Sequence, residues 1–178
     1  DGYVIDGQTR AFDVDQQVIK VRQPDGTLRD VPHTVRRTVH GPVFSDRRGV
    51  NVALRVSPAD RPRMFEQFWR MGLAKTFDEW RTAMRMQQLP IFHTMYADRD
   101  GHIMYVYNAA PPVRAHGDYA FWSGVIPGDR SALIPGDQIV PFDQLPQAID
   151  PPSGWVQNSN DSPWTSTYPV MIDPSKYL

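Results

Sequence analysis

The chain has 178 residues, a length suited to one domain or to a small and a medium one. Its 19 Lys and Arg residues and 20 Asp and Glu residues give a formal net charge of −1. This balance argues against nucleic acid or an anionic membrane as the main partner, because both require a basic excess. No apolar run approaches the roughly 20 residues that span a bilayer, and the absence of Cys excludes disulfides, thiolate metal sites and thiol nucleophiles.

The first 60 residues have the apolar alternation of antiparallel β-strands. Two β-rich runs fill residues 10–39, and the sequence PDGT at 24–27 between them is a strong turn signal, so we expect a long hairpin. Residues 50–56 alternate as a further strand. Residues 1–60 are therefore predicted to form a small antiparallel β subdomain.

The spacing of apolar residues then changes to that of helices. Four residues follow the i, i+3, i+4, i+7 pattern of a half-buried helix: Phe65, Phe68, Trp69 and Gly72. The sequence TFDE at 76–79 is a capping box, in which the Thr hydroxyl and the Glu carboxylate each accept a free backbone N–H. It predicts a second helix that runs to about Gln87 and is ended by Pro90.

A hairpin and a proline-rich segment follow the helices. Residues 91–97 and 102–107 are strand-like and are joined through an Asp-Gly pair at 100–101, a strong hairpin signal. From Ala109 onward 11 of the 17 prolines occur, which excludes long regular elements, while the tryptophans there indicate a packed segment. We therefore predict a mixed, β-dominated α+β fold, in which residues 61–178 supply helices packed on a sheet, the hairpin and the proline-rich packed segment.

No metal or cofactor is expected from the sequence. The five histidines include no pair with the i, i+4 spacing of a helical zinc site. His93 and His102, on the two strands of the hairpin, are interpreted as structural residues with hydrogen-bond partners. The sequence DRDG at 98–101 resembles the start of a calcium loop, but Ala109 stands where a bidentate Glu is needed. Gly-rich phosphate loops and the GxSxG motif are absent.

The most unusual segment is the polar cluster QNSND at 157–161, which lies between Trp155 and Trp164. Asn and Gln side chains provide neutral N–H donors that can stabilise a developing oxyanion without adding charge. The alternative is a turn held by Asx hydrogen bonds, which composition alone favours.

Four motifs resemble those of the penicillin acylase family of N-terminal-nucleophile amidohydrolases, which includes acyl-homoserine-lactone and aculeacin-type acylases. They are RTVHGPV at 37–43, YADRDGHIMY at 96–105, WSGVIP at 122–127, and PPSG at 151–154 followed by NSNDSP at 158–163. The motifs occur in the family order, which makes the set specific. The resemblance implies an internal segment of the nucleophile-bearing β subunit, with residues 61–178 forming part of an αββα sandwich.

The resemblance also implies a reaction. Members of the family cleave themselves from a precursor, and the new N-terminal Ser acts as nucleophile with its own α-amino group as base. A covalent acyl-enzyme forms, and water then releases the acid. The oxyanion is held by a backbone N–H and by an Asn side chain, which the motif NxN[ND]SP places at Asn160.

Three apolar residues are implied as an acyl pocket. The residues just before the hairpin motif line this pocket in the family, which carries over to Ile91 and Phe92. An aromatic residue of the first helix carries over to Phe68. An apolar lining suits an aromatic or fatty acyl group; the alternative is that these residues are ordinary core.

The chain departs from the family pattern at its start. Residue 1 is Asp rather than Ser, so the nucleophile and the backbone oxyanion donor are expected upstream, and the chain alone is expected to be inert. Its ends are interpreted as cut from a longer protein, and no metal ligand can be carried over. The expected partners are an acyl-amide small molecule and the rest of the precursor, namely the α subunit and the remainder of the β subunit. The resemblance implies a periplasmic or secreted location.

Other functions stay open at this point. The amide cleaved could belong to an acylated β-lactam nucleus, an acylated homoserine lactone or a related compound. A non-catalytic binding module on the same scaffold is the alternative from another class, and the residue at the upstream processing site distinguishes the two. A sugar-binding β protein would use Trp122, Trp155 and Trp164 as stacking platforms, but this hypothesis does not explain the four ordered motifs.

Overall fold

The computed structural model describes residues 2–45, 47–56, 61–89, 92–114, 116–134 and 138–176. These residues form three antiparallel sheets and three α-helices, so the predicted mixed, β-dominated fold is confirmed. No helix in these ranges is both long enough and apolar enough to cross a bilayer.

The chain separates into two compact units. One consists of Asp1–Val56 with Ala115–Pro135, and the other of Ser57–Arg114 with Gly136–Leu178. The two units are not divided at residue 60, because residues 115–135 of the proline-rich segment belong to the first unit. The predicted domains 1–60 and 61–178 stay a prediction.

In the first unit six strands form a hairpin and a four-stranded sheet. The hairpin pairs β1 (Gly2–Ile5) with β2 (Gln8–Ala11), and the sheet order is β3 (Asp13–Arg22), β4 (Leu28–Thr38), β5 (Gly41–Ser45) and β6 (Asn51–Ala53). The turn between β3 and β4 is the predicted one: Asp25 Oδ1 accepts the Thr27 backbone N–H at 2.9 Å, and Gly26 has a φ of 86°. β6 is shorter than the strand predicted at 50–56.

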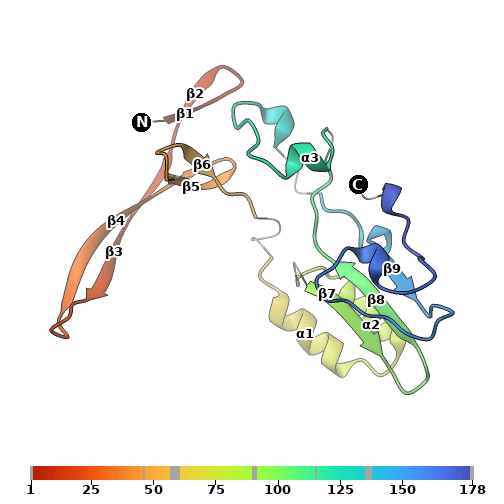
Figure 1. Ribbon diagram of the computed structural model, residues 1–178. Helices are drawn as coiled ribbons and strands as arrows, with labels where there is room; N and C mark the ends of the chain where they lie inside the picture. The colour runs from red at the N-terminus through yellow and green to blue at the C-terminus, as the bar shows by residue number, and fades with distance from the viewer. Residues whose placement is uncertain are drawn as a thin grey trace. The chain divides into compact units, whose positions relative to one another are not determined.

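The β3–β4 hairpin is a two-stranded ribbon whose residues are mostly exposed. It is drawn in red and orange in Figure 1. Val18 and Ile19, which point to opposite faces, are both exposed. Two strands alone are only marginally stable in water, and cross-strand polar contacts such as the 2.9 Å Lys20–Asp30 ion pair supplement the ladder. The ribbon itself contains no buried residue.

Gly41 forms the corner between β4 and β5. Its φ is 128°, and a Cβ at this position would collide with the backbone carbonyl of Leu54. Only Gly satisfies both constraints, which gives the HGP sequence of the first motif a structural reason.

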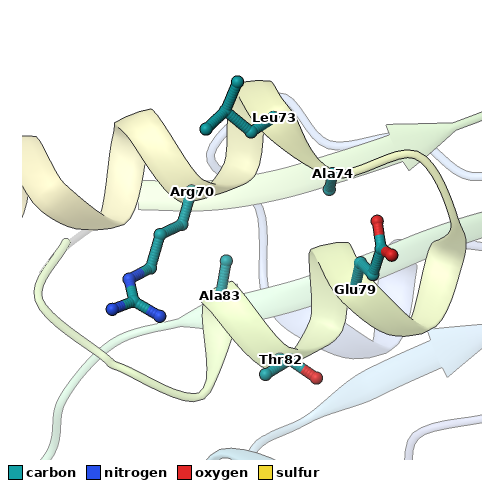
Figure 2. Close-up of a pocket in the computed structure, with 6 residues that line it drawn as sticks. All are labelled: Arg70, Leu73, Ala74, Glu79, Thr82 and Ala83. Atoms are coloured by element: carbon teal, nitrogen blue, oxygen red, sulfur yellow. The ribbon is translucent and has the colours of Figure 1, made fainter.

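The second unit packs two helices on a three-stranded sheet. The helices are α1 (Met64–Leu73) and α2 (Phe77–Met84), and the sheet order is β7 (Phe92–Ala97), β8 (Ile103–Asn108) and β9 (Gln147–Ile149). Figure 2 shows the helices side by side in front of the strands. The buried core consists of Trp80, Met84, Met104, Val106, Phe142 and Leu145. One face of the sheet is therefore covered by α2.

The predicted buried stripe of α1 is wrong, although the helix itself is confirmed. Phe65 is 79% exposed and Trp69 70% exposed, whereas Gln67 is fully buried. The Gln67 side chain accepts the backbone N–H of Gln88 at 2.6 Å and donates to the Met84 sulfur at 3.6 Å. Because this polar contact ties α1 to α2, the aromatic residues of α1 point away from the core.

The capping box of α2 is confirmed. Thr76 Oγ1 accepts the Glu79 backbone N–H at 3.2 Å, and the Glu79 carboxylate accepts the backbone N–H of Lys75 at 2.7 Å. The helix ends at Met84 rather than near Gln87, because the backbone then tightens into turns, with Gln87 N–H donating to the Met84 carbonyl. Pro90 lies outside the described residues.

The hairpin of β7 and β8 is confirmed, with a longer turn than an Asp-Gly pair alone requires. Ala97 pairs with Ile103, and Asp98 Oδ1 accepts the backbone N–H groups of Asp100 and His102 at 2.9 Å each. The described part of the proline-rich segment has only short elements: α3 (Tyr119–Trp122), β9, and 3₁₀ turns at Ser131–Leu133, Phe142–Gln144, Pro163–Thr165 and Pro174–Lys176.

Candidate functional site

Two of the four sequence motifs meet in the first unit. His40 of the HGP motif donates from Nε2 to the backbone carbonyl of Gly128 at 2.8 Å. On the same loop the backbone carbonyl of Asp129 accepts the Asp6 backbone N–H at 2.8 Å. Asp6 Oδ1 in turn accepts the Ser131 backbone N–H at 2.9 Å. These hydrogen bonds hold the segment after the WSGVIP motif against the first strands.

The other two motifs meet in the second unit. His102 of the hairpin motif lies 2.9 Å from Asp150, the residue before the PPSG motif. Asp150 also accepts the Ile103 backbone N–H through its carboxylate at 2.8 Å, and its own N–H donates to the Ile103 carbonyl at 2.9 Å. The start of the final motif is therefore fixed to the end of β8 nearest the turn.

An Asp150→Asn substitution tests this ion pair. The hydrogen bond between the two side chains is the main reason why the pKa of His102 is raised and that of Asp150 lowered. The raised His102 pKa adds stability that is complete below about pH 6.5 and lost as pH rises further; the lowered Asp150 pKa adds stability that is complete above about pH 4 and lost at lower pH. We expect the urea midpoints of the two proteins to differ most between about pH 4 and 6.5.

Asn is a suitable replacement because residue 150 has a φ of 45°, which Asn tolerates well. Its side-chain oxygen can still accept the Ile103 N–H. A difference in midpoint that does not change with pH would show that the ion pair contributes nothing beyond its hydrogen bonds.

Asn160 lies in a turn that a different asparagine holds together. Asn158 Oδ1 accepts the Asn160 backbone N–H at 2.7 Å, and Asn158 Nδ2 donates to the Asp161 carbonyl at 3.1 Å. Asn160 itself has a left-handed φ of 64° and is exposed. Its carboxamide makes no hydrogen bond within the described part of the chain. The Asx turn is thus present, but Asn158 forms it and leaves the Asn160 amide available.

The base of this loop is closed by further hydrogen bonds. Gln157 donates its side-chain N–H to the Thr165 carbonyl at 2.6 Å and its backbone N–H to the Ser166 carbonyl at 2.8 Å. Thr167 Oγ1 donates to the Trp155 carbonyl at 2.8 Å. Ser166 and Thr167 are buried, so Asn160 is carried on a loop with a fixed base.

His93 on β7 has a hydrogen-bond partner on the neighbouring strand β8. His93 Nδ1 is 2.8 Å from the Tyr105 hydroxyl. Burial lowers the pKa of His93, and the negative charge of Asp161 opposes this shift. His93 and His102 each have their own partner, as predicted for structural histidines.

The three predicted pocket residues are distributed over the second unit. Phe92 begins β7 next to His93 and is 60% exposed; Phe68 lies on α1 and is 52% exposed. Ile91 lies outside the described residues. Phe92 therefore lies on the sheet, whereas Phe68 belongs to the helix layer.

A hollow of about 220 Å³ between α1 and α2 is a different feature, shown in Figure 2. It is lined by Arg70, Leu73, Ala74, Glu79, Thr82 and Ala83. Arg70 is paired with Glu66 at 2.8 Å, and Glu79 caps α2, so the charged groups serve the helices. The hollow contains no predicted site residue. In the described part of the chain no three His, Asp or Glu residues are grouped so as to hold a metal ion.

Comparison with known proteins gives consistent matches. The sequence model of the family described as penicillin amidase matches residues 1–177. The chain is 25% identical over 200 residues to the acyl-homoserine lactone acylase PvdQ of Pseudomonas savastanoi pv. phaseolicola, covering 99% of this chain and 24% of that protein. It is 30% identical over 139 residues to the penicillin G acylase of Escherichia coli, covering 73% of this chain and 15% of that protein.

A solved structure matches as well. The thermostable penicillin G acylase from Alcaligenes faecalis, in its orthorhombic form, has a TM-score of 0.70 and 27% sequence identity, and the match covers 92% of this chain and 28% of that one. The chain therefore spans about a quarter of the length of the PvdQ relative and of this solved structure.

Proposed function

This chain belongs to the penicillin amidase family, and from that premise we propose that it is a segment of a longer amidohydrolase that cleaves an acyl amide through a covalent acyl-enzyme. The relatives are named as acylases of homoserine lactones and of penicillin G, which supports a small acyl amide as substrate. The nucleophile, an N-terminal Ser, is proposed to lie outside residues 1–178. The segment alone would then be inactive.

In this reaction the Ser hydroxyl attacks the amide carbonyl and passes its proton to the Ser α-amino group. The tetrahedral oxyanion collapses, the amine leaves with a proton, and an ester to Ser remains. Water then attacks the ester, releasing the acid and restoring the Ser hydroxyl. We assign to Asn160 the donation of its side-chain N–H to the oxyanion, beside a backbone N–H from another segment.

The observation that supports this role is that the two asparagines of the turn differ in their hydrogen bonds. Asn158 provides the Asx hydrogen bonds, whereas the Asn160 carboxamide is exposed and makes no hydrogen bond within the described residues. A neutral donor held on a fixed loop is what oxyanion stabilisation requires, because it needs no reorganisation when charge develops.

The acyl group is proposed to bind against Phe92, Ile91 and Phe68. Phe92 is 60% and Phe68 52% exposed, so each has apolar area that a bound acyl chain could bury. An aromatic or fatty acyl group fits such a lining.

The rest of the precursor is proposed as the partner of α1. Phe65, Trp69 and Leu73 form an exposed apolar face on this helix, and an apolar patch of this kind is typical of an interaction surface. Self-cleavage of the precursor and a periplasmic or secreted location complete the proposal, and they rest on the family alone.

The test is hydrolysis of a panel of acyl anilides, from short aromatic to long aliphatic, by the full-length protein, meaning the longer protein proposed to contain this chain. We expect turnover that ranks the acyl groups, and none from residues 1–178 alone. A full-length protein that cleaves itself correctly but hydrolyses no member of the panel would contradict the proposal and favour a non-catalytic binding module.

A further inference from the structure

Residues 87–89, in the connection from α2 to β7, are buried although they belong to no helix or strand. Buried backbone N–H and C=O groups need hydrogen-bond partners, and outside a helix or a sheet ladder side chains commonly supply them. Gln87 also has a left-handed φ of 44°, and its side chain donates to the Val140 carbonyl at 3.0 Å. Such a φ costs free energy for a residue with a Cβ, so it persists only where surrounding contacts impose it.

Two buried carboxamides from other elements hold the rest of this segment. Gln67 Oε1, on α1, accepts the Gln88 backbone N–H at 2.6 Å. Asn108 Nδ2, at the end of β8, donates to the Leu89 carbonyl at 2.8 Å. Both side chains are fully buried, and a buried polar network of this kind specifies one arrangement of the groups that it joins. The segment is therefore fixed from the helix layer and from the sheet.

The same two carboxamides are neighbours of the proposed acyl-binding residues. Leu89 precedes Phe92 by three residues, and Asn108 is paired with Phe92 in the ladder of β7 and β8. Gln67 directly precedes Phe68 on α1. Because the side chains of Phe92 and Phe68 are more than half exposed, their positions depend on the backbone that carries them. The bonds to residues 87–89 hold that backbone.

We propose that Asn108 is a positioning residue that sets acyl selectivity: its hydrogen bond to Leu89 holds the backbone that leads to Phe92. The bond from Gln67 acts on the same segment from α1. This inference rests on the proposed function and deepens it. Asn108 acts through the backbone and not on the reacting amide, so its loss changes the KM for the acyl group rather than the chemical step. One methylene in an apolar pocket changes kcat/KM about 10- to 200-fold, so a displaced lining is measurable.

Gln147 on β9 provides a matched control. Its Nε2 donates to the carbonyls of Phe142 and Leu145 at 3.2 Å and 3.4 Å. Its Oε1, like Asn108 Oδ1, is buried and has no hydrogen-bond partner within the described residues. The two carboxamides thus have the same kind of bonding in one sheet, but Gln147 holds a segment that contains no proposed site residue.

The kinetic test compares full-length Asn108→Leu, Gln67→Met and Gln147→Met proteins on acyl anilides of different chain length. We expect Asn108→Leu to lower the ratio of kcat/KM between the best and the poorest acyl group about tenfold, mainly through a higher KM for the best one. Gln67→Met should change the ratio in the same direction, so the test does not depend on the folding of one variant. Gln147→Met should keep the wild-type ratio.

Competitive inhibition by the free carboxylic acid of the best acyl group provides a readout without turnover. Its inhibition constant should rise about tenfold in Asn108→Leu and stay at the wild-type value in Gln147→Met. A wild-type acyl ranking and inhibition constant in Asn108→Leu overturns the inference. Equal changes in Gln147→Met also overturn it, because they would show that loosening any buried carboxamide of the sheet has this effect.

The two proposals fail in different ways. If the wild-type protein hydrolyses the panel and Asn108→Leu leaves the acyl ranking unchanged, only the role of Asn108 is refuted. If the wild-type protein hydrolyses no acyl amide, the proposed function and the positioning role are both refuted.

Discussion

We expect Asn160→Gly to lower the kcat of the full-length protein by about 10²–10³-fold, the usual cost of removing one oxyanion donor. Asn160 has a φ of 64°, which Gly adopts freely, so the substitution removes the carboxamide without straining the turn. Because this carboxamide makes no hydrogen bond within the described residues, folding and self-cleavage should be retained. The measurement is kcat for an acyl anilide after the processed subunits have been confirmed by gel.

Two further variants separate the amide from the turn. Asn160→Ala should lose as much activity as the Gly variant and, in addition, about 1 kcal/mol of stability, because Ala is disfavoured at a left-handed φ. Asn158→Asp keeps the oxygen that accepts the Asn160 N–H and loses only the N–H donated to Asp161, so its kcat should fall far less. A wild-type kcat in Asn160→Gly would remove Asn160 from the oxyanion hole.

The hairpins and the cap of α2 could be predicted because their chemistry is local. The turn at Asp25 and Gly26 and the cap at Thr76 each depend on residues within four positions of one another. The burial of α1 could not be predicted in the same way. Gln67 is buried because the backbone of Gln88, 21 residues later, donates to it, and helical periodicity contains no information about that contact.

The candidate site shows the same limit. The polar cluster and the family motifs single out the loop at 158–163, but composition cannot tell which asparagine forms the turn. That assignment depends on the φ of Asn160 and on the Asn158 hydrogen bonds. The partner of His93 could not be predicted for a related reason: Tyr105 lies 12 residues away, and only strand register places it beside the ring.

Met84→Ala should destabilise the second unit by about 2–5 kcal/mol, the usual cost of truncating a fully buried Met. Met84 ends α2 inside the core, has no exposed surface, and its sulfur accepts the Gln67 side-chain N–H at 3.6 Å. Met84→Leu conserves most of the volume and should cost less than about 1.5 kcal/mol. Urea unfolding of the full-length variants measures both values, and equal losses would show that the site relaxes around the cavity.

Phe65→Ala extends this comparison to the outer face of α1. Phe65 is 79% exposed in this chain, and an exposed substitution typically changes stability by no more than about 0.5 kcal/mol. If the rest of the precursor covers this face, the loss in the full-length protein should instead approach the 3–5 kcal/mol expected for a buried Phe. A loss near zero would leave α1 facing solvent and contradict its proposed role as a subunit contact.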